Sequence, residues 1–137
     1  MFPAGHMPVG AAVQFLIPGP WGYAAALASH LVVDGVGEAG YKNFKVMMVA
    51  QIFWFLVLAT ILCVTKQPYL AIGAILGELP DIFLILAKLK IINYEKGIKW
   101  HKAIHKLALQ PLIPLTPKIQ VVVHFAFHFV LFGLLVK

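Results

Sequence analysis

The segment that most constrains the fold is the apolar run from Leu70 to Ala87, because two acids and a proline lie in its interior. Its length and composition predict a membrane-spanning helix. An ionisable side chain at the centre of a bilayer costs about 2.5–3.5 kcal/mol on insertion scales. Glu78 and Asp81, within one turn of each other, therefore indicate a buried polar site, and Pro80 removes a backbone donor and kinks the helix beside them. The alternative is that both acids are structural and pair with a lysine or histidine of a neighbouring helix.

The composition indicates a single integral membrane domain over residues 1–137, because 61% of the residues are hydrophobic and 12% are charged. The net charge of +6 comes entirely from lysines, which stand between apolar runs. Anionic lipid headgroups are therefore a better counterpart than nucleic acid. Cys63 is the only cysteine, which excludes an intrachain disulfide. Residues 1–19 contain no lysine or arginine, which argues against a cleaved signal peptide.

The apolar runs predict an all-α fold, a polytopic membrane helix bundle with about four transmembrane helices and one interfacial amphipathic helix. Pro20 suits the first position of a helix and Gly40 the residue after its end. The predicted transmembrane helices are 20–39, 46–65, 69–87 and 119–136, and the predicted interfacial helix is 95–109. Residues 1–19 are interrupted by prolines and glycines, so we expect an irregular lead-in with His6 at the surface and without a partner.

The lysines predict the orientation. Nine of the eleven lie in the connections 40–45 and 88–118, against Lys66 and Lys137 on the other side. The positive-inside rule then makes segment 88–118 cytoplasmic and both termini external, in an inner or plasma membrane. The oligomeric state is left open.

The helix at 95–109 places lysines on one face and apolar residues on the other, which suits a position in the headgroup region. We expect Trp100 and Ile104 to pack against the bundle and to hold His101 and His105 over it.

Five of the six histidines lie four residues from another histidine or from an aspartate, which places each such pair on one helix face. Imidazole nitrogens and carboxylate oxygens are ligands of zinc and similar divalent metals. An open coordination position on the ion would activate water for hydrolysis. The candidate metal ligands are His30, Asp81, His101, His105, His124 and His128, with Glu78 or Asp34 as a further ligand or general base. The alternative is that the histidines satisfy one another or backbone carbonyls.

Helical rise gives the depth of each candidate and places the polar residues of four segments in the cytoplasmic half of the bilayer. Asp81 and His124 come at matching depths, and His105 lies at the surface of the same leaflet. We therefore expect Asp81, His105 and His124 to reach one metal ion.

The order of the motifs resembles a known family. His30 comes first, then Leu-Pro-Asp-Ile at 79–82, then His-Lys-Ala-Ile-His at 101–105, and finally His124 and His128. This order resembles the YdjM-like membrane-bound metal-dependent hydrolases, which show an early His, a Leu-Pro-Asp-x-Asp segment, a His-Arg-x-x-Thr-His segment and a late Ser-His-x-x-x-Asp. The resemblance implies a membrane-embedded metal site that catalyses hydrolysis.

The chain departs from the family pattern at four positions. Phe83 stands at the second Asp, Lys102 replaces Arg, Ile104 replaces Thr, and His128 replaces the last Asp. These departures argue against a complete two-metal site. Metal binding would then rely on altered ligands, with Glu78 or Asp34 in compensation.

Two classes of function follow. The first is a membrane metal-dependent hydrolase that acts on a phosphate ester or a lipid-linked substrate, with Lys99, Lys102 and Lys106 attracting its negative charge. The second is a non-enzymatic small membrane protein. It would be an ion or proton carrier that uses the buried acids and histidines as a relay, or a haem-binding subunit with His30 and His124 as axial ligands.

Overall fold

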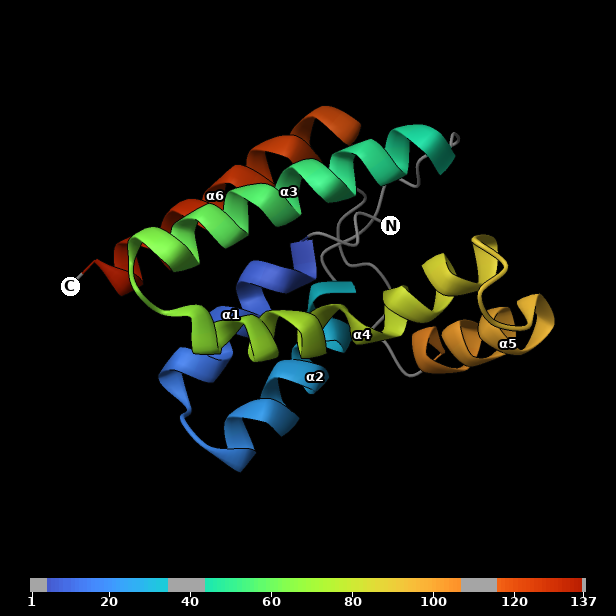
Figure 1. Ribbon diagram of the computed structural model, residues 1–137, viewed down its shortest axis with the longest axis horizontal. Coiled ribbons are helices and arrows are strands. Elements are labelled where there is room, and N and C mark those ends of the chain that lie inside the picture. Colours follow the sequence, from blue (N-terminus) through green and yellow to red (C-terminus); the bar gives the residue numbers. More distant parts are fainter. Residues whose placement is uncertain (1–4, 35–43, 107–115, 137) are drawn as a thin grey trace.

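The computed structural model describes residues 5–34, 44–106 and 116–136, and all regular structure in them is helical. The helices are α1 (His6–Leu16), α2 (Pro20–Asp34), α3 (Phe44–Val64), the short 3-10 helix η2 (Pro68–Leu70), α4 (Ala71–Lys88), α5 (Tyr94–His105) and α6 (Pro117–Leu135). Helix α4 is central. Helices α1 and α2 pack against it, α3 and α6 lie side by side beyond α1, which both contact, and α5 packs at one end of α4 (Figure 1). The prediction of an all-α fold is confirmed for the described residues.

Helix α1 corrects the expectation of an irregular lead-in and of a surface His6. His6 is the first residue of α1 and is 2% exposed. Pro8 is compatible with the helix because it lies in the first turn, where backbone N–H groups have no intrahelical partner. Pro8 thus belongs to a helix start, and Gly10 to a close packing contact.

Glycines bring α1 and α4 into backbone contact. A Cβ on Gly10 would overlap the carbonyl oxygen of Gly73 and approach Gly77 Cα to 3.0 Å. A Cβ on Gly77 would lie 2.7 Å from the carbonyl oxygen of His6. This is the small-residue packing by which membrane helices approach each other closely. It holds His6 beside the middle of α4.

We expect Gly10→Ala to lower the free energy of unfolding by about 1–3 kcal/mol, because an added methyl group cannot fit without separating two backbones. Gly133 in α6 is the matched control, since a Cβ there meets nothing within 4 Å. Gly133→Ala should leave stability unchanged or raise it by up to about 1 kcal/mol through helix propensity. Thermal unfolding in detergent measures both variants, and equal effects would contradict the α1–α4 contact.

The helices match the predicted spans unequally. Among the described residues, one helical stretch, Pro68–Lys88, is long and apolar enough to cross a membrane, and Met48–Val64 and Val121–Leu135 are shorter apolar stretches. Helix α2 has 15 residues, about 22 Å at 1.5 Å per residue, which is short of a bilayer core of about 30 Å. Residues 35–39 of the predicted first span lie outside the described part.

The helix directions place the start of α1 and the end of α6 at opposite ends of α4, while the external position of both termini stays a prediction. Contacts of His6 with Gly77 and of Gln14 with Gly73 make α1 antiparallel to α4. Helix α1 therefore begins beside the half of α4 that contains Asp81. Helix α6 ends at the opposite side of the core, where Leu135 belongs to the same apolar cluster as residues 62 and 70.

Helix α5 packs on α4 through a glycine. A Cβ on Gly97 would lie 2.5 Å from the Ala87 Cβ, so the two helices touch there. Trp100 is 58% exposed and contacts Phe83 with its ring edge, at 5.6 Å between centroids. The expectation that Trp100 and Ile104 pack against the bundle is met by this ring contact, although Trp100 stays largely exposed, and by Ile104, which lies beside His30 and Pro80. Residues 107–109 of the predicted interfacial helix lie outside the described residues.

Candidate metal centre

Asp34, the last residue of α2, is surrounded by three imidazoles from three helices. His6 Nε2 lies 3.4 Å from Asp34 Oδ1, His30 Nε2 lies 3.5 Å from Oδ2, and His105 Nδ1 lies 2.9 Å from Oδ2. Helical spacing brings His30 and Asp34 together, and antiparallel packing of α1 on α2 supplies His6. The Asp34 side chain is 3% exposed, so these imidazoles replace much of its hydration.

Asp81, inside α4, has a similar environment. His101 Nε2 lies 3.0 Å from Asp81 Oδ1, His105 Nε2 lies 3.6 Å from the same oxygen, and His6 Nε2 lies 3.8 Å from Oδ2. The side chain is 1% exposed. His105 thus faces Asp34 with one nitrogen and Asp81 with the other, so the two carboxylates form one cluster.

The two ring nitrogens of His30 have different surroundings. Its Nδ1 lies 2.8 Å from the carbonyl oxygen of Gly77. A carbonyl only accepts, so Nδ1 donates, and the lone pair of the neutral ring is on Nε2. This buried Nε2 has no hydrogen-bond partner and faces the carboxylate of Asp34 at 3.5 Å. Two acceptors that face each other in a buried site are stabilised by a proton, a metal ion or a water molecule that donates to both.

Ligand-type atoms converge in two triads, His6–His30–Asp34 and His30–Asp81–His105, and within each triad they lie within 4.8 Å of one another. Tetrahedral zinc with bonds of about 2.0–2.2 Å separates its ligand atoms by about 3–3.5 Å, so small side-chain movements would close either triad on an ion. Both triads use His30, whose Nδ1 is occupied by the Gly77 carbonyl. With one nitrogen left, His30 can serve one ion at a time.

The carbonyl behind His30 is itself typical of metal sites. A ligating histidine usually donates its second ring N–H to a carbonyl or carboxylate, which fixes the tautomer and the ring orientation. Gly77 lies one turn before Asp81 on α4, so the helix that supplies the Asp81 carboxylate also orients His30.

His105 is positioned by the helix that lies over the cluster. Burial alone would lower the pKa of His105, but hydrogen bonds with Asp34 and Asp81 and their negative charges outweigh it and raise the pKa to about 10. Without metal, His105 is therefore an imidazolium at neutral pH. It has to release this proton to act as a metal ligand.

His124 and His128 of α6 both contact the ring of Trp54. His124 packs near Gly5 and Trp54, and His128 stacks on Trp54 at 4.7 Å and bonds the His124 carbonyl oxygen through Nδ1. Neither belongs to the two triads. The expectation that Asp81, His105 and His124 converge on one ion is therefore not met among the described residues, because α6 turns both histidines towards Trp54 of α3.

Glu78 is fully buried and accepts a hydrogen bond of 2.6 Å from Gln51 Nε2 of α3. Glu78 belongs to neither triad. Its carboxylate binds an amide of α3 and lies one turn before the carboxylate of Asp81 along α4.

Sequence reasoning missed His6. The signal that could have found it is spacing, because residues 6, 10 and 14 lie four apart and form one helix face. Asp34 was expected only as a further ligand or general base, but it belongs to one of the two triads. Ser29, His30 and Asp34 reproduce the Ser-His-x-x-x-Asp pattern that the resemblance places late in the chain. No family model, curated protein or solved structure matches this chain.

Proposed function

We propose that this chain is an integral membrane hydrolase that uses one divalent metal ion, with zinc favoured by the histidine and aspartate donors. The observation that carries the proposal is the buried Nε2 of His30, oriented by the Gly77 carbonyl and aimed at the Asp34 carboxylate. Asp34, Asp81, His6, His30 and His105 are the candidate ligands, and one of the two triads would hold the ion with its fourth position open to water. The ion would supply a Lewis acid and lower the pKa of a water molecule.

His101 is the group we assign to proton transfer. It belongs to neither triad, its side chain is 15% exposed, and Asp81 bonds its Nε2 at 3.0 Å. A histidine oriented by a carboxylate and reachable from water suits a general base. This role replaces the expectation that Glu78 acts as the base, since Gln51 already binds that carboxylate.

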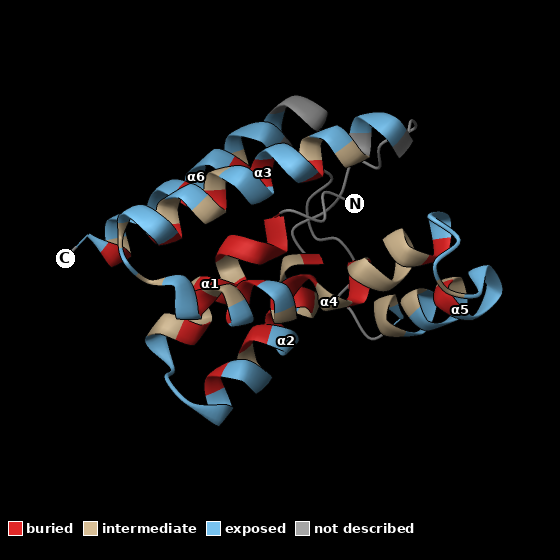
Figure 2. Ribbon diagram, in the orientation of Figure 1, coloured by how far each residue is buried: buried red, intermediate tan, exposed pale blue. Residues whose placement is uncertain are grey.

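The apolar exterior supports the membrane location. Large side chains along the outer faces of α3 and α6 are exposed, among them Val49, Ile52, Phe129 and Val130 (Figure 2). Contiguous exposed apolar surface of this kind suits contact with lipid or another protein. The apolar helices α3, α4 and α6 then cross the bilayer, and α1 and α2 form a shorter hairpin against α4.

The lysines favour a cytoplasmic position for the site. Lys99, Lys102 and Lys106 border an open surface pocket of about 540 Å³ on α5. Positive charge beside the histidines favours anionic headgroups and phosphate esters. A phosphate ester or lipid-linked substrate is therefore the substrate class that we assign.

We expect a cysteine at position 96, in a Cys63→Ser background, to resist an impermeant thiol reagent in intact cells. Residue 96 is exposed on α5, and segment 88–118 should be cytoplasmic. Permeabilised cells give the control, because the same cysteine must then react. Labelling in intact cells would reverse the orientation.

Hydrolysis itself is tested with chromogenic p-nitrophenyl phosphate esters and purified protein in detergent, with and without zinc. We expect zinc-dependent release of nitrophenol, and His101→Gln should lower kcat by about 10²–10⁴-fold while zinc stays bound. Release that is equally fast in the metal-free protein, or none with zinc bound, would contradict a metal-dependent hydrolase.

A further inference from the structure

A surface groove has one residue of the metal cluster, His30, in its lining. It has a volume of about 300 Å³ and lies between α2, α4 and α5. Its walls are Ala24, Leu27 and Ala28 of α2 with Ile104 of α5, and His30 and Pro80 form part of its lining. The volume is at the lower end of the range for small-molecule sites.

The lining of the groove is apolar except at His30. Ala24 lies ten residues before Asp34, about 15 Å along the helix axis. The wall residues are apolar, and His30 is the metal-cluster residue among those that line the groove. An apolar channel that ends on a polar centre matches an amphiphile, with the chain along α2 and the headgroup at the cluster.

The exposed and buried residues of the groove favour entry of a ligand from the lipid. Leu27 is 41% exposed in the middle of α2, whereas the lysines are on α5. His30 is fully buried, so the cluster is closed to water at this end. Ile104 precedes His105 in α5 and lines the groove, so a headgroup that displaces the Ile104 side chain arrives beside a cluster residue.

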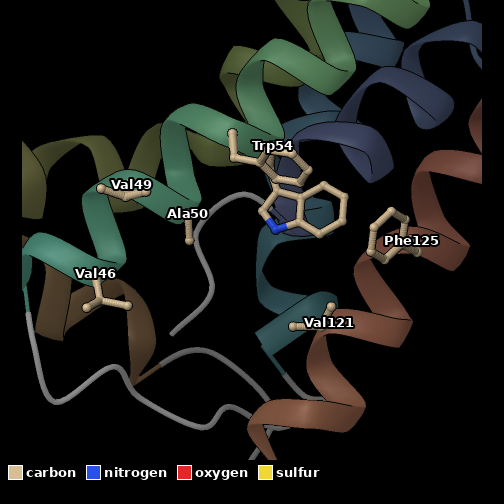
Figure 3. A pocket seen from close by; sticks show the side chains of 7 residues that line it. Val46, Val49, Ala50, Trp54, Val121 and Phe125 are labelled. Carbon is tan, nitrogen blue, oxygen red and sulfur yellow. The ribbon is translucent and has the colours of Figure 1, made fainter.

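A second apolar groove shows the contrast. It has a volume of about 460 Å³ between α3 and α6, lined by Val46, Val49, Phe53, Val121 and Phe125 around Trp54 (Figure 3). No histidine or carboxylate lines it. It can accommodate a lipid tail, but it offers the headgroup no metal cluster.

We propose that the substrate is an alkyl phosphate ester from the membrane, whose chain lies in the groove between α2 and α5 and whose phosphate reaches the His30 end of the cluster. The phosphate chemistry rests on the proposed function. The chain site rests on the groove itself.

The test uses a dodecylphosphonate with a diazirine at the far end of its chain, which binds like the substrate but cannot be hydrolysed. Zinc-loaded protein in nanodiscs is irradiated, and the labelled residues are mapped by mass spectrometry. We expect labels on α2 near Ala24 and Leu27, and we expect Ala28→Phe to reduce them about tenfold or more by filling the groove. Val32→Phe is the control, because Val32 is 62% exposed and does not line the groove.

Each outcome separates this inference from the proposed function. Labels on α3 and α6, or labels on α2 that Ala28→Phe leaves unchanged, would overturn the groove while zinc-dependent hydrolysis could still hold. Groove labels in a zinc-loaded protein that hydrolyses no phosphate ester would overturn the hydrolase and leave a lipid-binding site.

Discussion

Replacing Asp81 with asparagine is expected to weaken zinc binding by more than about 100-fold, beyond the 10–100-fold that loss of an outer-shell partner costs. Asp81 is 1% exposed and faces three imidazoles from two other helices. An amide keeps the shape but loses the negative charge that a divalent ion needs. Equilibrium dialysis against buffered zinc measures the change.

Glu78→Gln is the matched control for Asp81→Asn. Both replace a buried acid of α4 by its amide, and both disturb a buried polar contact, since Glu78 accepts a hydrogen bond from Gln51. Each should lower the melting temperature, because breaking a buried charged pair or hydrogen bond costs several kcal/mol. Only Asp81→Asn should release zinc, and equal zinc loss in both variants would mean that general destabilisation, not ligation, is being measured.

The second large effect is expected from His105→Ala, which should also lower zinc affinity by at least 10–100-fold. His105 bridges the two carboxylates, at 2.9 Å from Asp34 and 3.6 Å from Asp81. His124→Ala should remove packing against Trp54 and lower stability, yet zinc affinity should stay within about threefold of wild type, well below the loss of even an outer-shell partner.

This pair of variants discriminates between the two arrangements of the site. A loss of zinc in both variants would restore the arrangement that the sequence suggested, with Asp81, His105 and His124 on one ion. A loss in His124→Ala alone would contradict His105 as a ligand.

The length of the apolar runs and the spacing of residues along a helix predicted most of the fold that the structure shows. The runs at 46–65, 69–87 and 119–136 agree closely with α3, with η2 and α4 together, and with α6, because apolar segments of this length favour a helix. Spacing of four correctly placed His30 with Asp34 on one helix face. The burial of both acids of α4 also agrees with the expectation from their cost in lipid.

What the sequence could not supply was rotation and helix approach. A depth estimate does not say which way a helix faces, so His124 matched Asp81 in depth while α6 turned it towards Trp54. The glycines of α1 looked like helix breakers, although Gly10 is required by the approach of Gly73. His6 lacked a ligand-type residue at spacing four, because its partners Asp34 and Asp81 belong to distant segments, although its spacing from Gly10 and Gln14 marks one helix face.

The metal content of the purified protein tests the central claim most directly. The protein is extracted in mild detergent, exposed to zinc, freed of excess metal and measured by elemental analysis beside the Asp34→Asn, Asp81→Asn double variant. We expect about one zinc ion per wild-type chain, since His30 offers one free nitrogen, and close to none in the variant. A folded, helical wild-type protein that retains no divalent metal would contradict the metal centre and return the cluster to a network of imidazoles and carboxylates that share protons.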